Sequence, residues 1–373
     1  MLRFGWHLAA AAGIAALVAP VEAKELNYGS GVPAKSETMA IGITEYLKDV
    51  EKQTKGSLTF KLLAGSQVVT LNTTLAGLRD GTIDLGFVVP VFTRKELVNT
   101  NVVYDTQVFG TDSAAITGAV NDTILFDCKE CLNDYKRNGA VYIASYGNEP
   151  YNLICRNKVT TVAELKGLKI RAVGATTRLV SALGGVPVSM DPPEATTSLQ
   201  RGGLDCVHGV VNWLQNFGYW DVAKHVVEYP LGSPRVIGAV TVGRRAWDGL
   251  SADHKRALID NAPMALARLV FIVNKEGDAK IKNRAIKEKG ITFSGGGRDF
   301  DVVLDKFRES EAGTIADAFK KQGVKNPEAI LAAFKKNLAK WEKISKDEIK
   351  DDMNALARAL KREIFDKVDA AKL

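Results

Sequence analysis

The sequence lacks the residue patterns on which most enzymes and nucleotide-binding proteins depend. It contains no G-x-S-x-G nucleophile motif, no H-E-x-x-H metal helix, no Walker phosphate loop and no G-x-G-x-x-G dinucleotide motif. It has only four histidines and four cysteines, and these show no second ligand pair at metal spacing. We therefore expect no catalytic residue, no metal and no cofactor.

Blocks of one charge sign and long apolar runs are also missing after the N-terminal segment. The net charge is +7, but the densest basic stretch, residues 275–289, is interleaved with acidic residues. Such a pattern is typical of a solvated helix face rather than of a nucleic-acid-binding surface. The remaining composition, 46% hydrophobic and 25% charged, is that of a globular protein, and the length favours two lobes over one enlarged core.

The N-terminal segment reads as a secretion signal. Arg3 supplies a positive start, residues 8–18 are apolar, and residues 21–23 (VEA) resemble a cleavage site. The apolar run ends at Pro20 and is too short to span a bilayer. We expect a signal peptide over residues 1–23, a mature chain from Lys24 and an exported, periplasmic protein.

The four cysteines, Cys128, Cys131, Cys155 and Cys206, would meet an oxidising compartment after export. Three pairings are possible. We expect Cys128 and Cys131 to form a local disulfide or to be buried thiols, and the spacing does not decide whether Cys155 and Cys206 pair.

The first part of the mature chain alternates strands and helices, as parallel α/β sheets do. Strands are predicted at residues 25–29, 58–63 and 83–89, and helices at 36–56 and 73–80. A second alternating unit begins near Tyr142. Its predicted strands are 151–155, 168–172 and the segment after Gly203, and its predicted helices are 176–183 and 193–201.

The rest of the chain is predicted to connect these two units. The apolar segment 235–242 is long enough to be a strand that crosses back to the first unit. A helical pattern follows from Ser251 to Lys289, and Pro263 should kink or split it. Residues 300–373 are helical and charged.

Several motifs occur in an order that is typical of one protein family. Residues 162–171 (VAELKGLKIR), 183–190 (LGGVPVSM) and 194–205 (EATTSLQRGGLD) form the core of the match, and shorter matches lie at 65–67, 78–85 and 246–253. Any one motif is weak, but the ordered set resembles the DctP-type solute-binding proteins of TRAP (tripartite ATP-independent periplasmic) transporters.

The resemblance implies an α/β fold of the two-lobe periplasmic-binding-protein type (type II-like), with crossing strands, a long bracing helix and a helical C-terminus. Lobe I would contain residues 24–146 and 236–250, and lobe II residues 147–235. Residues 251–290 would form the bracing helix, kinked near Pro263, and 291–373 a C-terminal strand and helices that pack on both lobes.

The resemblance also implies the ligand contact. In the family, the arginine that ends the GLKIR strand pairs with the ligand carboxylate, and here that residue is Arg171. A planar guanidinium matches two carboxylate oxygens. A helix starting at 174–177 would aim its free N–H groups at an anion in the cleft.

The sequence departs from the family pattern where a second arginine and a pocket asparagine usually stand, at Tyr151 and Gly209, and Pro192 replaces a frequent pocket aromatic. The remaining ligand-contact candidates are Asn148, Tyr151, His208, Asn212 and Trp213 from lobe II, with Gln67, Phe87 and Phe92 from lobe I. With fewer cations available, a monocarboxylate, aromatic or 2-oxo, should bind better than succinate or malate, unless Arg178 or Arg235 reaches the cleft.

The function that the resemblance implies is a periplasmic receptor that captures an organic acid between its lobes and delivers it to TRAP membrane subunits. The alternatives are a receptor of an ABC importer and an orphan sensor or scavenger. We expect a monomer without enzymatic activity.

Overall fold

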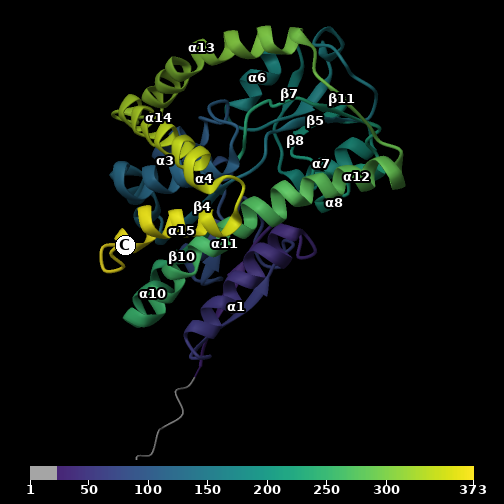
Figure 1. Cartoon of the computed structure of the whole chain (residues 1–373). Coiled ribbons are helices and arrows are strands. Elements are labelled where there is room, and N and C mark those ends of the chain that lie inside the picture. The colour runs from purple at the N-terminus through teal and green to yellow at the C-terminus, as the bar shows by residue number, and fades with distance from the viewer. Residues whose placement is uncertain (1–22) are drawn as a thin grey trace, which may run out of the picture.

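The computed structural model describes residues 23–373. The predicted signal peptide, residues 1–23, lies outside the described residues except for Ala23, so it stays a prediction. The described chain forms two α/β lobes, each built on one sheet, with helices that run from one lobe to the other (Figure 1). This arrangement confirms the predicted two-lobe fold class.

The five-stranded sheet A forms the centre of lobe I, in the strand order β2-β1-β3-β10-β4. Its strands are β1 (Lys24–Gly29), β2 (Leu58–Leu63), β3 (Leu85–Gly86), β4 (Ala140–Gly147) and β10 (Arg235–Gly243). Strand β10 returns from lobe II and lies antiparallel between β3 and β4. The sheet is therefore mixed, and β4 near Tyr142 belongs to sheet A instead of beginning the second unit.

Strand β3 is much shorter than the strand predicted over residues 83–89. The Val88 N–H bonds to the Gly238 carbonyl, beside a register shift in β10, and Pro90 begins the helical turn η2. Because proline lacks an N–H donor, it cannot extend a ladder in the middle of a sheet.

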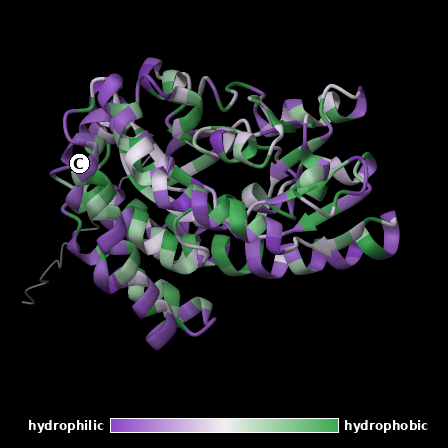
Figure 2. Ribbon diagram, turned by 90° about the horizontal axis from the view of Figure 1, so that it is seen from above, coloured by the Kyte–Doolittle hydropathy of each residue, from purple (hydrophilic) through white to green (hydrophobic). Residues whose placement is uncertain are grey.

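Helices cover sheet A and contribute most of the lobe I core. They are η1 (Thr38–Ile43), α1 (Thr44–Gln53), α2 (Thr74–Asp80), η2 (Pro90–Thr93), α3 (Val98–Tyr104), α4 (Ser113–Asp122), η3 (Thr123–Asp127), α5 (Lys129–Arg137) and α9 (Arg244–Asp248). Hydrophobic and hydrophilic residues alternate along the helical ribbons in Figure 2, as they do in helices that bury one face.

The six-stranded sheet B forms lobe II, in the order β11-β9-β5-β8-β6-β7. Its strands are β5 (Asn152–Cys155), β6 (Lys169–Arg171), β7 (Val186–Val188), β8 (Cys206–Gly209), β9 (His225–Glu228) and β11 (Thr292–Gly295). Strand β5 is antiparallel to both neighbours, whereas β6 is parallel to β7 and β8. The helical segments of this lobe are η4 (Ala163–Leu165), α6 (Thr176–Ala182), α7 (Pro192–Gln200), α8 (Trp213–Asn216) and η5 (Tyr219–Asp221).

A long helical series joins the two lobes along one side (Figure 1). It consists of α10 (Ala252–Asp260), α11 (Ala262–Arg268), η6 (Leu269–Glu276) and α12 (Gly277–Lys289), with a break at Asn261. Pro263 lies in the first turn of α11, where its missing N–H breaks no helical hydrogen bond. The part Leu258 to Val273 packs in the lobe I core, and Ile281 and Ala285 pack in lobe II.

The run Ala252–Lys289 is long and apolar enough to cross a membrane by length and composition, but 72% of its apolar window is buried inside the protein. This degree of burial is typical of a core helix.

The C-terminal helices also connect the lobes. They are α13 (Arg298–Lys321), α14 (Pro327–Ile344), η7 (Ser345–Ile349), α15 (Met353–Glu363) and η8 (Phe365–Lys367). The first half of α13 buries Phe300 and Leu304 in lobe II, and its second half buries Ile315 and Phe319 in lobe I. Helix α13 is thus a strap across the molecule, opposite the long helical series in Figure 1.

All four cysteines form disulfides. Cys128 pairs with Cys131 at the start of α5, which confirms the expected local disulfide and excludes the alternative of two buried thiols. Cys155 pairs with Cys206, and these two residues face each other in the register of β5 and β8. The antiparallel strand pairing therefore decides what the sequence spacing left open.

Candidate ligand-binding site

A cavity of about 80 Å³ lies between the lobes. On this measure one water needs about 10–15 Å³, so the cavity is large enough for a small organic molecule. Its walls come from both sheets and from the segments that connect them. The lining residues are Val32, Thr38, Leu71, Phe87, Val89, Phe92, Tyr104, Tyr146, Asn148, Tyr151, Arg171, Pro192, Asn212, Trp213, Asn216, Phe217, Pro234, Arg235 and Val236.

Arg171 ends strand β6 and lines this cavity, as the sequence predicts for its position. Its side chain is only 1% exposed. Its Nε donates to the Met190 carbonyl at 2.9 Å, and its Cζ lies 5.2 Å from the centroid of the Trp213 ring. Among residues 23–373 no carboxylate forms an ion pair with it, so the rest of its fork is not neutralised by the protein.

Aromatic rings form the wall beside Arg171. The Tyr151 and Trp213 ring centroids are 5.7 Å apart, and those of Trp213 and Phe217 are 5.4 Å apart. Phe87 approaches from lobe I, with its ring centroid 6.4 Å from that of Tyr146. Phe92 lines the cavity as well. The site thus combines a buried cation with an apolar, largely aromatic surface.

A row of amide side chains forms the polar part of the wall. Asn216 Nδ2 donates to Asn212 Oδ1, and Asn212 Nδ2 donates to Asn274 Oδ1, each at 3.2 Å. The Asn212 backbone N–H donates to Asp278 at 2.9 Å, which fixes the start of α8. Asn216 Oδ1 is buried without a partner among the described residues. Asn148, predicted from the sequence, also lines the cavity.

His208 lies behind the cavity instead of lining it. It is 1% exposed, its ring nitrogen Nε2 is 3.1 Å from the Leu231 carbonyl, and its ring centroid is 4.3 Å from that of Tyr151. Burial lowers the pKa of His208 to about 3. His208 therefore packs against Tyr151 from behind the cavity wall. Its side chain on strand β8 points toward Leu231 instead of into the cavity.

Gln67 is exposed in the loop after β2 and does not line the cavity. The loop enters the site through another residue, Leu71. The Gly-Ser-Gln motif at residues 65–67 therefore identifies a loop that reaches the cavity, but the residue of this loop that lines the cavity is Leu71 and not Gln67.

Arg235 begins strand β10 and is the second guanidinium in the cavity wall. Its Nη1 donates to the Ser233 carbonyl at 3.1 Å and its Nη2 to the Phe109 carbonyl at 2.7 Å. Its Cζ lies 4.8 Å from the centroid of the Phe334 ring. From the sequence, Arg235 was considered only as a possible additional cation in the cleft. The pattern that could have identified it as a site residue is a single charged residue at the start of an otherwise apolar strand. Arg235 therefore meets the exception attached to the monocarboxylate expectation, that another cation could reach the cleft.

Arg178, the other arginine considered for the cleft, does not line the cavity. It forms an ion pair with Glu311 of helix α13. It therefore joins lobe II to the strap.

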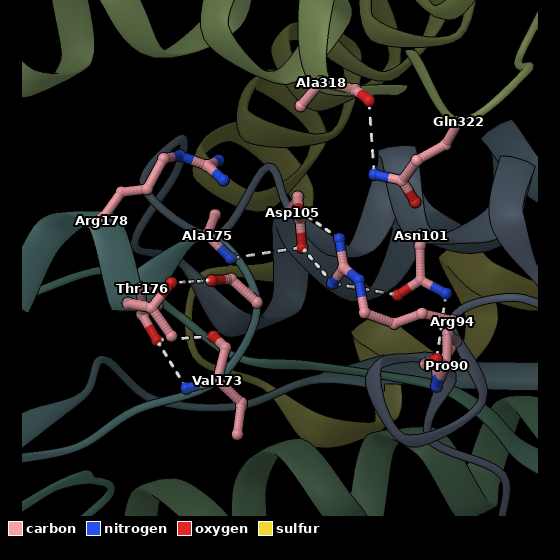
Figure 3. A network of polar contacts seen from close by, with 12 residues as sticks. Pro90, Arg94, Asn101, Asp105, Val173, Ala175, Thr176, Arg178, Ala318 and Gln322 are labelled. Carbon is pink, nitrogen blue, oxygen red and sulfur yellow. Dashed lines mark hydrogen bonds and ion pairs between the residues drawn. The ribbon is translucent and has the colours of Figure 1, made fainter. Parts of the chain in front are cut away.

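The start of helix α6 holds a protein carboxylate, so the expectation that it faces a ligand anion is not supported. Asp105, in lobe I, accepts from the Ala175 N–H at 3.3 Å and pairs with Arg94 through contacts of 3.1 and 2.9 Å (Figure 3). Gly174 has φ +60°, and a Cβ there would lie 2.8 Å from Asp105 Oδ1. The Ala175 N–H, at the N-cap of α6, thus joins lobe II to lobe I.

No group of three or more metal-ligating side chains occurs within the described part of the chain.

Comparisons with known proteins show to which sequences and folds the chain is similar. A family model, bacterial extracellular solute-binding protein family 7 (DctP), matches residues 29–295. The 2,3-diketo-L-gulonate-binding periplasmic protein YiaO of Escherichia coli (strain K12) is 24% identical over 267 residues, which are 68% of this chain and 76% of that protein.

Solved structures share the fold at low sequence identity. The TRAP solute-binding protein of Rhodoferax ferrireducens T118 with copurified benzoate has a TM-score of 0.78 and 16% identity, covering 86% of this chain and 99% of that chain. The TRAP periplasmic solute-binding protein of Bordetella bronchiseptica with bound mandelate has a TM-score of 0.72 and 22% identity, covering 85% and 99%.

Proposed function

The chain belongs to the bacterial extracellular solute-binding protein family 7, the DctP family, and from this membership we propose that it is the receptor of a TRAP importer for a small organic acid. The acid is held between the two lobes and is passed to the membrane subunits of the importer.

The observation that carries this proposal is the charge of the cavity. Two arginines line it, and no aspartate or glutamate does so among the described residues. A buried cation without a partner is costly, and a ligand carboxylate removes that cost while forming strong charge-assisted hydrogen bonds. Arg171 is the proposed carboxylate-binding residue because its fork lies in the cavity with only Nε bonded to the protein backbone.

The rest of the wall favours an acid with an aromatic body. Tyr151, Trp213, Phe217 and Phe87 offer ring faces and edges, against which an aromatic ligand packs favourably. Two solved structures with the same fold contain benzoate and mandelate, which are aromatic monocarboxylates. We therefore place Tyr151, Trp213, Phe87, Asn148 and Asn212 around the ligand.

The wider setting of this function is proposed as follows. The signal peptide is removed after Ala23, and the mature receptor works in the periplasm as a monomer without catalytic activity. Lobe I comprises residues 24–146 and 236–250 and lobe II residues 147–235, with the long helix and the C-terminal region joining them.

Thermal unfolding of the mature protein with a panel of acids and their uncharged amides tests the proposal. A ligand at a hundred times its dissociation constant adds roughly 2.7 kcal/mol of stability. We expect benzoate or mandelate to raise the melting temperature, whereas benzamide and mandelamide do not. Equal shifts with acids and amides, or none with any carboxylate, would contradict a carboxylate receptor.

A further inference from the structure

The cavity contains more positive charge than one carboxylate can balance. Arg171 comes from strand β6 of sheet B, and Arg235 comes from strand β10 of sheet A. Each is only 1% exposed, and neither has an ion-pair partner within residues 23–373. A monocarboxylate bound at Arg171 would leave the charge of Arg235 unbalanced.

The two arginines line the same cavity as Tyr151. Burial raises the pKa of Tyr151, and both Arg171 and Arg235 act against this rise, which places the Tyr151 hydroxyl within the field of both groups. Burial lowers the pKa of Arg235 to about 9, so its guanidinium is still charged at neutral pH. A ligand beside Tyr151 therefore meets two cations.

Arg235 is also held in a fixed orientation. The Ser233 and Phe109 carbonyls each accept one of its terminal N–H groups, and Phe334 lies under the guanidinium. These contacts leave the Nε donor, which is buried and has no partner among the described residues. A buried donor without an acceptor costs about 1–3 kcal/mol, a cost that an acceptor on a ligand in the cavity lined by Arg235 would offset.

We propose that Arg235 is a specificity-determining residue that binds a second oxygen acceptor of the ligand, next to the carboxylate held by Arg171. The preferred ligands are then aromatic acids with a 2-oxo or 2-hydroxy oxygen or a second carboxylate near the first. This proposal rests on the carboxylate-receptor function proposed above and narrows its ligand class.

A matched series of acids tests this role. Phenylacetate has one carboxylate, phenylglyoxylate adds a keto oxygen at the next carbon, and phenylmalonate adds a second carboxylate there. Calorimetry on the wild-type protein should show phenylglyoxylate or phenylmalonate binding at least about tenfold more tightly than phenylacetate, the step that 1.4 kcal/mol represents. Tighter binding of phenylglyoxylate would indicate that Arg235 prefers a neutral keto oxygen, and tighter binding of phenylmalonate that it prefers a second carboxylate.

The Arg235→Met variant should bind all three acids with similar affinity, because methionine keeps an apolar chain about as long as the arginine stem up to Nε but removes the donors and the charge. Arg178→Met is the matched control, since Arg178 pairs with Glu311 outside the cavity and should change all three affinities by one common factor. If Arg235→Met does not fold, as judged by circular dichroism, Arg235→Leu provides the same comparison, because leucine also lacks donors and charge.

Equal binding of the three acids by the wild-type protein, or a preference that persists in Arg235→Met, would overturn this role while leaving the carboxylate receptor intact. Failure of all three acids to bind would overturn the aromatic-acid function and this proposal together.

Discussion

Arg171 is buried at the end of a strand and yet forms no ion pair with a carboxylate among residues 23–373. The Met190 carbonyl and the Trp213 ring hold it in place, so little side-chain entropy is lost when a ligand binds. In the proposed function Arg171 is a preorganised carboxylate-binding group, and its contribution to affinity depends on the forked geometry as well as on the charge.

Replacing Arg171 with lysine should weaken binding strongly without unfolding the protein. Lysine keeps the charge but loses the planar fork, and loss of a buried, charge-assisted pair costs about 2 kcal/mol or more, which is about 30-fold in affinity. Calorimetry with the acid that gives the largest thermal shift measures the effect. Arg178→Lys serves as the control outside the cavity. Binding by Arg171→Lys within a few-fold of the wild type would show that Arg171 does not hold the carboxylate.

His208 should make the stability of the protein depend on pH. Its pKa is about 3 in the folded protein, below its usual value of 6.5, because burial disfavours the charged ring. Its contribution to the free energy of unfolding is thus fully present above pH 6.5 and is lost as the pH falls toward 3, at about 1.4 kcal/mol per pH unit.

The variant His208→Gln should remove this part of the pH dependence. Urea unfolding at pH 7 and pH 4.5 would show the wild type losing more stability than the variant, and His254→Gln, outside the cavity lining, should behave like the wild type. A wild-type loss equal to that of His208→Gln would mean that His208 takes up a proton in the folded state at pH 4.5.

Individual site residues were predictable to different degrees. Arg171 was predictable only through the resemblance of residues 162–171 to the DctP motif, because an arginine at the end of a short strand has no distinguishing pattern of its own. Arg235 and Tyr104 reach the cavity from segments 131 residues apart, so only the tertiary fold brings them together. His208 and Gln67 lie near the site but do not line it, since a single register or loop position decides where a side chain points.

Among the secondary-structure elements, strands with a regular apolar pattern were predicted well, as β1 and β2 show. The antiparallel pairing of β10 with β3 and β4 was not predicted, because register depends on partners distant in the sequence. Helices α3 to α5 were also missed. Buried residues cover every face of α4, so it lacks the amphipathic period that marks a surface helix.

The two disulfides should differ in their effect on stability. Cys155 and Cys206 are 51 residues apart and join β5 to β8, whereas Cys128 and Cys131 are 3 residues apart. Loop closure in the unfolded chain predicts a stabilisation of about 4 kcal/mol for the first and about 2 kcal/mol for the second.

Chemical denaturation of two double variants checks this order. Replacement of Cys155 and Cys206 by alanine should lower the free energy of unfolding more than replacement of Cys128 and Cys131, and all four cysteines are buried, so the loss of packing is similar. A larger loss from the Cys128 and Cys131 pair would contradict the loop-closure argument.

At the scale of the whole molecule, the lobes are held together by contacts outside the cavity. Asp105 of lobe I binds the start of α6 in lobe II, and Arg178 of lobe II binds Glu311 of the α13 strap. The cavity residues Arg171, Tyr151 and Arg235 are almost fully buried in this arrangement. In a two-lobe receptor, a ligand that contacts both lobes stabilises closure by its higher affinity for the closed state.

A crystal structure of the mature protein with the tightest-binding acid of the panel tests the central claim most directly. We expect the acid in the cavity between sheets A and B, with its carboxylate oxygens within hydrogen-bond distance of the Arg171 guanidinium and its ring against Trp213 and Tyr151. An acid bound outside this cavity, or inside it without contact to Arg171, would contradict the account.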